Sequence, residues 1–538
     1  MESQSGFTRG RGTVDGFFNV QQALEVRKAN GLDTWALMLD LKKAFDRVDR
    51  KLLWIVLGRF GVPPTLIQVI RKLYDGSTLK MKMEGAKMDP IPSTTGVKQG
   101  DNLAPILFLF VFQAAIEGME WPAGCDPVSF QCSQDGVLWN RNLGQTQNLD
   151  RDNIKYRTPR SVTDFDLRES LYADDAGLLF GSHAAWQAGL VAIRGRLATF
   201  GLEMHYAHPG EDLESSKTVG IFFPAMPGAD ASTQAIGLLN EFKVGRRTFT
   251  TGRVPWVTSF KYLGSHLSSD LSDIPNTTAR VRAASKAYGA LSPILRDRNI
   301  ALKARSRLYV QLVIPVLLYG SECWQLSSES QRKLATFHHG CCRKIAGVSK
   351  WRQWKRGIKS SEIAATMEVQ PITWYVAKRF MKWIGHVARM PQGRLPKQLM
   401  FAWPRGGAAT IQGGNGSKLL RSVGGKKYRC FNMAAYHAIV IMQQCLTTDE
   451  PALAARFRTV IGKEDERFEC DREKVYGTSE WKKRYKRRAL REGIHWRVGP
   501  SFADGCLNWS PYASWMRVAE DRDAWRLAIA SFLRNQRY

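Results

Sequence analysis

The chain has 538 residues, of which 44% are hydrophobic, so it suits about two to four globular domains and is too apolar for a disordered protein. Lys and Arg number 78 against 49 Asp and Glu, a net charge of +29 that favours nucleic acid as a partner and an anionic membrane surface second. We find no secretion signal and no apolar stretch long enough to span a bilayer, so we expect an intracellular protein, nuclear or cytoplasmic. Nine scattered Cys without a Cys-x-x-Cys pair favour reduced thiols.

Hydrophobic spacing predicts the first third of the chain in some detail. Residues 34–41 form an unbroken apolar run, which is typical of a buried strand. The spacing around it predicts, in order, a helix over 14–32, helices over 42–61 and 63–76, a hairpin and loop over 77–101, and a buried helix over 102–119.

The next part begins with residues 120–170, which are polar, lack periodicity and predict an insertion or loop. We then expect short strands over 171–173 and 178–180 around a turn at 174–177, with Gly177 supplying the unusual backbone angle. Further elements are a helix over 184–202, strands over 215–224 and 259–267, a helical region over 277–347, and a Gly-rich linker over 404–427. This order predicts an α+β fold rather than a βαβ repeat.

Adjacent carboxylates interrupt the apolar stretch "LYADDAGLLF", at Asp174 and Asp175. An Asp pair in a turn often only bonds nearby backbone. The alternative is a divalent-metal site, which needs a further carboxylate. Asp40 supplies one, because it ends an apolar strand where a lone charge is costly. If the two strands are neighbours, we expect the Asp40 and Asp174 carboxylates within roughly 4–7 Å, around two Mg²⁺ ions suited to phosphoryl transfer.

Several stretches, in this order, resemble the reverse transcriptases of LINE-type, non-LTR retrotransposons. The matching stretches are "LDLKKAFD" (39–46), "TTGVKQGDNLAPILF" (94–108), "YADD" (172–175), "GLEMH…SSKT" (201–218), "FKYLG" (260–264), "IPVLLYGSECW" (314–324), "RFMKWIGHVARM" (379–390) and "WMRVAEDRDAWR" (515–526). The resemblance implies a right-hand polymerase palm with partial fingers over 1–270, a helical thumb or connection over 271–370, and a basic, mainly helical C-terminal region over 371–538. It also implies RNA template, DNA primer or target and deoxynucleoside triphosphates as partners, with Mg²⁺, or Mn²⁺, as cofactor.

The same resemblance implies roles for individual residues. Asp40 and Asp174 would be the principal metal ligands, with Asp175 assisting, and Lys217 would protonate the departing pyrophosphate. A surface lysine is an equally good interpretation of Lys217. Substrate contacts would fall to Phe45, which would exclude a ribose 2′-hydroxyl, and to Tyr172, Gly96, Gln99 and Gly100. The primer grip would be Phe260, Tyr262, Leu263 and Gly264. Asp46 and Asp49 are interpreted as helix-surface charges.

The tail is the most basic part of the chain, since residues 371–538 carry 31 Lys and Arg against 14 Asp and Glu. Within it, "WKKRYKRRALR" (481–491) combines cations with Trp481 and Tyr485, and we expect it to bind nucleic acid through phosphates in a salt-dependent way. Its candidate contacts are Lys482, Lys483, Arg484, Lys486, Arg487 and Arg488. "HHGCC" (338–342) has metal-binding residue types, but adjacent side chains diverge on a helix, which argues against zinc.

The chain departs from the family pattern at its start. The fingers segments that the resemblance places upstream, including an Arg-Pro stretch, are missing, while Gln4, Gly6 and Phe7 match an internal Gln-x-Gly-Phe segment. We therefore expect a truncated polymerase that extends a primer poorly unless an upstream fingers segment is fused to it. Two alternatives stay open: a catalytically dead nucleic-acid-binding relic, and another palm polymerase, intron-encoded or viral. The viral class usually has Gly where Ala173 precedes the Asp pair.

Overall fold

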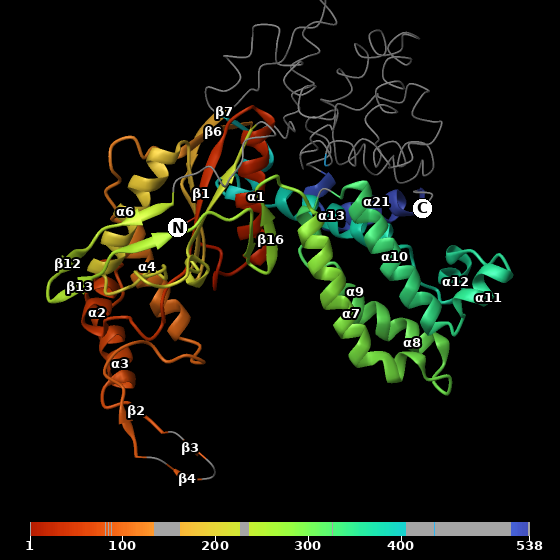
Figure 1. Ribbon diagram of the computed structural model, residues 1–538, viewed down its shortest axis with the longest axis horizontal. Helices are drawn as coiled ribbons and strands as arrows, with labels where there is room; N and C mark the ends of the chain where they lie inside the picture. Colours follow the sequence, from red (N-terminus) through yellow and green to blue (C-terminus); the bar gives the residue numbers. More distant parts are fainter. Residues whose placement is uncertain are drawn as a thin grey trace, which may run out of the picture. The chain divides into compact units, whose positions relative to one another are not determined.

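The computed structural model describes residues 2–80, 82–83, 86–87, 89–133, 162–225, 236–324, 326–404, 435 and 518–535. They divide into two compact units. The first unit comprises Met1–Gly16, Gly31–Ser129 and Asp166–Leu263, and the second comprises Phe17–Asn30, Phe130–Phe165 and Gly264–Tyr538. Sheet and helix are mixed in the first unit, and helices dominate the second (Figure 1). The expected mixture of helix and sheet is thus confirmed.

A four-stranded sheet in the order β10-β1-β9-β8 forms the centre of the first unit. The strands are β1 (Thr34–Leu39), β8 (Glu169–Tyr172), β9 (Asp175–Phe180) and β10 (Val219–Phe223). β1 lies between β9 and β10 and is antiparallel to both. An inner strand has apolar neighbours on each side, which explains why its sequence, TWALML, is apolar almost throughout.

Helices cover this sheet and supply the rest of its core. Trp186 of α6 is fully buried, and its indole N–H donates to the Ala36 carbonyl of β1 at 3.1 Å. Phe108 and Phe112 of α4 belong to the same hydrophobic cluster as Leu37 and Leu178 of the sheet. The helices of this unit are the first turn of α1 (Thr13–Ala29), α2 (Arg50–Arg59), α3 (Pro64–Tyr74), α4 (Ala104–Glu117) and α6 (His183–Thr199).

The predicted helix over 42–61 is wrong in its first half. The structure begins α2 at Arg50, because Lys43 has a left-handed φ of 48° and the Asp49 carboxylate accepts the N–H groups of Lys51 (2.8 Å) and Leu52 (3.2 Å) as an N-cap. The apolar spacing of 42–49 therefore serves a compact turn rather than a helix. Asp49 is a cap and not merely a surface charge.

Residues 120–170, expected to be a loop, contain a strand at each end, β6 (Val128–Ser133) and β7 (Val162–Leu167), with 134–161 outside the described residues. β17 (Ala402–Pro404) pairs with β6 from Ala402↔Cys132 to Pro404↔Phe130. The other short strands are β2 (Thr78–Leu79), β3 (Lys82–Met83), β4 (Ala86–Lys87), β5 (Ile91–Pro92), β11 (Gly237–Leu239), β12 (Phe242–Val244), β13 (Arg247–Phe249), β14 (Gly252–Val254), β15 (Ser259–Tyr262) and β16 (Ser265–Ser268).

The second unit is built on α7 (Ile274–Arg296) and α10 (Ser328–Ile345), which pack against each other and against the π-helical turn Tyr309–Val313. Tyr309, Val313, Leu317 and Leu334 lie in its core. The remaining helices are α8 (Leu302–Leu308), α9 (Ile314–Leu317), α11 (Lys350–Lys355), α12 (Ser360–Thr366), α13 (Ile372–Ala388), α14 (Leu395–Met400) and α21 (Arg522–Asn535).

Two of the stretches singled out in the sequence pack on each other here. The Trp525 indole of α21 donates to the Met381 carbonyl of α13 at 3.0 Å, and Arg389 donates to the Ala519 carbonyl at 2.7 Å. Gly385 makes this packing possible, since a Cβ there would lie 2.0 Å from the indole nitrogen. The stretches 379–390 and 515–526 thus pack directly on each other within the second unit.

None of the helices that the structure describes is long and apolar enough to cross a membrane. The predicted linker over 404–427 falls, apart from its first residue, outside the described residues.

Candidate active site

Two residues, Ala173 and Asp174, make the turn between β8 and β9. Tyr172 pairs with Asp175 across it, and Ala173 has a φ of 58° in the left-handed region. The prediction that Gly177 supplies the unusual angle is wrong: Gly177 lies inside β9, opposite Met38 and Ser170. A two-residue hairpin turn needs left-handed backbone, and here a non-glycine residue adopts it, which is strained.

The register of β1 and β9 brings Asp40 to this turn. Leu39, the last residue of β1, pairs with Ala176, so the next position along each strand puts Asp40 level with Asp175. The predicted neighbouring of the two strands is therefore confirmed. All three Asp side chains are partly buried.

The charge of Asp40 raises the pKa of the two other carboxyls of this set. Burial is the main reason that the pKa of Asp175 rises to about 6, and repulsion from Asp174 and Asp40 adds to it. Burial likewise raises the pKa of Asp174, helped by Asp40. Carboxylate oxygens are the donors that Mg²⁺ prefers, and a divalent cation would remove the repulsion, so the chemistry of this set fits a metal. Among the described residues, however, no three His, Cys, Asp or Glu side chains are gathered closely enough to form a ready-made metal site.

The N-terminal segment holds the strained turn in place. The Gln4 side-chain oxygen accepts the N–H of Ala173 at 3.0 Å and that of Gly6 at 2.7 Å. Ser5 donates to the Leu171 carbonyl, and Leu171 donates to that of Ser3, both at 2.8 Å. A Cβ on Gly6 would lie 2.4 Å from the Ala173 nitrogen. This role of Gln4 and Gly6 was not predicted, because nothing local in 171–175 points to a partner so distant in the chain.

Lys217 lies beside the same site through His205. The backbone N–H of Lys217 donates to the His205 ring at 3.4 Å, and that of His205 donates to the Asp40 carbonyl at 2.9 Å. The Thr218 hydroxyl contacts the backbone of Asp40. Burial lowers the pKa of His205, while Asp40 opposes and Lys217 reinforces that effect. His205 was not a predicted site residue, although it stands in the stretch that resembles the family.

The loop that contains Gly96 packs against residues 45–48, in the turn that follows Asp40 in the chain. The N–H of Val97 donates to the Phe45 carbonyl at 2.8 Å, and the N–H of Gly96 to that of Val48 at 2.9 Å. Gly96 has a φ of 76°, and a Cβ there would lie 2.7 Å from the Asp46 carbonyl oxygen. Phe45 stacks on Phe108 at 4.9 Å between ring centres and stays partly exposed.

Gln99 and Gly100 are exposed at the end of this loop, and Gly100 has a φ of 89°. Tyr172 is partly buried beside the turn. The structure therefore brings Phe45, Gly96 and the loop that ends in Gly100 together.

The residues predicted to grip a primer occupy the end of the first unit. The Tyr262 hydroxyl donates to the Ser170 carbonyl of β8 at 2.9 Å, and burial raises the pKa of this phenol. Phe260 is partly buried, and Leu263 has a left-handed φ of 48°. Gly264, with a φ of 78°, begins the last segment of the second unit, directly after Leu263 ends the first unit.

The remaining candidates lie elsewhere. Lys482, Lys483, Arg484, Lys486, Arg487 and Arg488 fall outside the described residues. In the stretch 338–342 the His338 ring lies 2.9 Å from the Tyr309 hydroxyl and 3.7 Å from the Cys342 sulfur, both buried protein partners. The buried part of this stretch thus packs inside the second unit.

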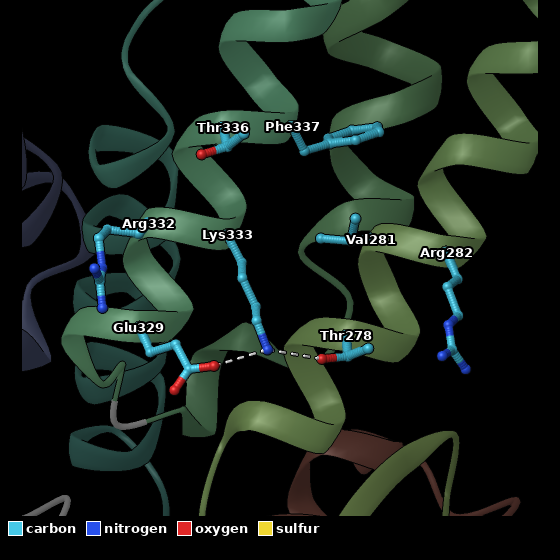
Figure 2. A pocket seen from close by; sticks show the side chains of 8 residues that line it. All are labelled: Thr278, Val281, Arg282, Glu329, Arg332, Lys333, Thr336 and Phe337. Atoms are coloured by element: carbon cyan, nitrogen blue, oxygen red, sulfur yellow. Dashed lines mark hydrogen bonds and ion pairs between the residues drawn. The ribbon is translucent and has the colours of Figure 1, made fainter.

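A groove of about 530 Å³ lies between α7 and α10 of the second unit. Figure 2 shows Lys333 reaching from α10 between Glu329 and Thr278, with Phe337 and Val281 above it. The Lys333 ammonium is 3.0 Å from the Glu329 carboxylate and 3.4 Å from the Thr278 hydroxyl. Its cation is already paired with an acid, so the groove has no evident catalytic group.

Comparison with known proteins decides the family. Residues 1–267 match the family model described as reverse transcriptase (RNA-dependent DNA polymerase). The chain is 29% identical over 108 residues to the Pol polyprotein of the type-2 retrotransposable element R2DM of Drosophila melanogaster, covering 20% of this chain and 10% of that protein. The chain carries a reverse transcriptase domain of the LINE type.

Other relatives agree with this assignment. The chain is 29% identical over 154 residues to the transposon-derived protein F52C9.6 of Caenorhabditis elegans, and the match covers 29% of this chain and 54% of that protein. It is 28% identical over 193 residues to the 115 kDa protein of the R1DM element of Drosophila melanogaster, covering 34% and 17% respectively. The chain thus spans about half the length of the first relative and far less of the others.

Proposed function

We propose that this reverse transcriptase copies an RNA template into DNA at the site formed by Asp40, Asp174 and Asp175. The register that puts Asp40 level with Asp175, in a chain of this family, is the observation that supports the proposal most. Reverse transcriptases generally use divalent metal ions, and a set of partly buried, mutually repelling carboxylates is suited to them. RNA template, DNA primer or target and deoxynucleoside triphosphates are the partners that we propose.

The three carboxylates would hold two Mg²⁺ ions, or Mn²⁺ in their place. When bound, the ions would lower the pKa of the primer 3′-hydroxyl and offset the charge of the triphosphate. The part of the protein is to hold the carboxylates in position: β1 and β9 fix two of them, and Gln4 fixes the backbone that carries the third. Lys217, exposed beside His205, would donate a proton to the departing pyrophosphate.

The neighbouring residues would select and align the nucleotide. Phe45 would block a ribose 2′-hydroxyl with the exposed part of a ring that Phe108 holds rigid. Gly96, Gln99 and Gly100, with Tyr172, would line the template base and incoming nucleotide. Phe260, Tyr262, Leu263 and Gly264 would support the primer end. We also propose that the first unit is the palm with part of the fingers, and that helices of the second unit form the thumb.

Primer extension on an RNA template tests the proposal. The assay is run on the 538-residue chain with and without Mg²⁺. Asp174→Asn should abolish the Mg²⁺-dependent extension that the parent shows. Asp46→Asn is the matched control, because Asp46 is an exposed acid six positions after Asp40. Extension that survives Asp174→Asn would refute the site.

A nucleic-acid-binding role without catalysis is the second candidate, favoured by the net charge of +29. It predicts salt-dependent binding of template–primer by a chain that never extends the primer. Binding and extension measured on one preparation separate the two functions.

A further inference from the structure

The turn of helix at α11 exposes two indole rings. Trp354 is 81% exposed and Trp351 is 63% exposed, which makes Trp354 the most exposed large apolar side chain in the described part of the chain. The two are three residues apart on one helix and so lie on the same face. Among the described residues, no other ring packs on Trp354. Two exposed indoles on one face need an explanation beyond ordinary surface composition.

The rest of the segment is firmly held. The Ser349 hydroxyl accepts the N–H of Arg352 at 3.1 Å as an N-cap, and Gly357, with a φ of 61°, ends the helix. Val348 and Ile358 on either side pack against the hydrophobic core of the second unit. The indoles are therefore presented by a fixed scaffold rather than by a loose loop.

Cations surround the indoles without compensating acids. Residues 343–359 carry seven Lys and Arg and no Asp or Glu. The Lys355 ammonium lies 4.6 Å from the centre of the Trp351 ring. In the described part of the chain no ion pair joins an acid to the exposed side chains of Lys350, Arg352, Lys355, Arg356 and Lys359. The Glu362 carboxylate accepts only the backbone N–H of Lys359, at 3.3 Å. The segment thus offers a positive field around two open aromatic faces.

We infer that the segment 349–359 is a stacking platform for single-stranded nucleic acid, whose bases rest on Trp354 and Trp351 while its phosphates contact the flanking cations. Exposed π-faces bind unpaired bases of any sequence, and cations follow the backbone. An apolar peptide partner would leave the five exposed cations without a use. A duplex would offer phosphates but no open bases for the rings. The inference does not depend on catalysis by the carboxylates of the first unit.

The experiment compares a fluorescent oligodeoxythymidine with an abasic oligonucleotide of the same length and charge, bound to the full chain. Trp354→Phe keeps a π-face, whereas Trp354→Leu keeps an apolar side chain without one. Stacking predicts that the parent and Trp354→Phe prefer the base-containing strand, and that Trp354→Leu lowers affinity for it by roughly tenfold. Affinity for the abasic strand should be the same for all three. Thermal melts show that each variant folds.

Crosslinking locates the contact and separates it from binding elsewhere in this basic chain. An oligonucleotide with 5-iodouracil should crosslink to the peptide containing Trp351 and Trp354. Asp174→Asn should leave this crosslink unchanged, so failure of the catalytic proposal would not affect it. Two results would overturn the platform. One is the absence of a crosslink to this peptide, and the other is an equal loss of affinity for the base-containing and the abasic strand in Trp354→Leu. A third is binding to phosphatidylserine vesicles that Trp354→Ala abolishes while oligonucleotide binding is unchanged, which would make the segment a membrane contact.

Discussion

Each unit buries a cluster of ionisable groups, and the two clusters differ in what surrounds them. In the first unit the partly buried Asp174 and Asp175 face each other and Asp40, all of the same charge. In the second unit His338 is fully buried, but its two ring nitrogens lie beside the Tyr309 hydroxyl and the Cys342 sulfur. Burial lowers the pKa of His338 to about 4 and raises those of Cys341 and Cys342 to about 12.

This comparison teaches that burial of polar groups alone does not mark a reactive site. The second cluster is neutral and its polar atoms have partners, so it serves packing. The first cluster keeps like charges together on a strained turn, which costs stability unless a cation or substrate relieves it.

Asp174→Asn gives the largest effect we expect. Removing one charge from the first cluster should lower extension by roughly 10²–10³-fold or more, because electrostatic stabilisation at a reacting phosphate is lost. Single-turnover extension with saturating nucleotide measures it. Asp46→Asn should stay near the parent rate. An equal loss of rate in both variants would show that the overall negative charge, rather than the position of Asp174 in this cluster, determines the rate.

Gly6→Ala should disturb the same cluster without touching a charge. The added Cβ would clash with the Ala173 nitrogen and displace the Asp174 backbone, and a misplacement of that kind can cost roughly 10²-fold in rate. Extension rate and melting temperature are measured together. Gly12→Ala is the control, because a Cβ there meets only the Asp15 carboxylate at 3.8 Å. The comparison fails if Gly6→Ala melts like the parent and extends at the parent rate.

His338→Gln tests the neutral cluster through pH. The folded pKa of His338, about 4, is below its ordinary value of 6.5, so its contribution to stability is complete above pH 6.5 and is lost as the pH falls toward 4. That loss amounts to about 2–3 kcal/mol. Urea unfolding of the second unit at several pH values measures this. The variant should lose this part of the pH dependence of the free energy of unfolding, while His339→Gln should keep most of it. Zinc or EDTA should not shift either transition; a zinc-dependent shift would identify a metal site.

Asp175→Asn should give the smallest effect, of opposite sign. The folded pKa of Asp175, about 6, lies above its ordinary value of 3.8, so the cost of its charge appears as the pH rises from about 4 to 6 and is complete above 6. Without divalent ions the variant should therefore gain about 1 kcal/mol at pH 7, allowing for partial exposure, and nothing below pH 4. Calorimetry with and without Mg²⁺ measures this, since Mg²⁺ should shrink the gain. A variant less stable than its parent at pH 7 would mean that the charges are already compensated.

Local sequence predicted the elements whose signal is local. The apolar run of β1, the amphipathic spacing of α3, the helix α6 and the Asp pair between two short strands were all predictable, because propensity and periodicity act over a few residues. Asp40 stood out for the same reason, as a charge at the end of an apolar strand. The order of the family-like stretches then pointed to reverse transcription before any geometry was known.

Tertiary structure decided the rest. The pairing of β1 with β9 and the left-handed Ala173 in place of Gly177 depend on partners far along the chain. Gln4 reaches the turn across 169 positions, and no local pattern encodes such a bond. Sequence by itself determined which groups could do chemistry, since that is a property of residue type. Only the packed sheet could place like charges side by side, because their mutual repulsion must be offset by contacts elsewhere in the fold.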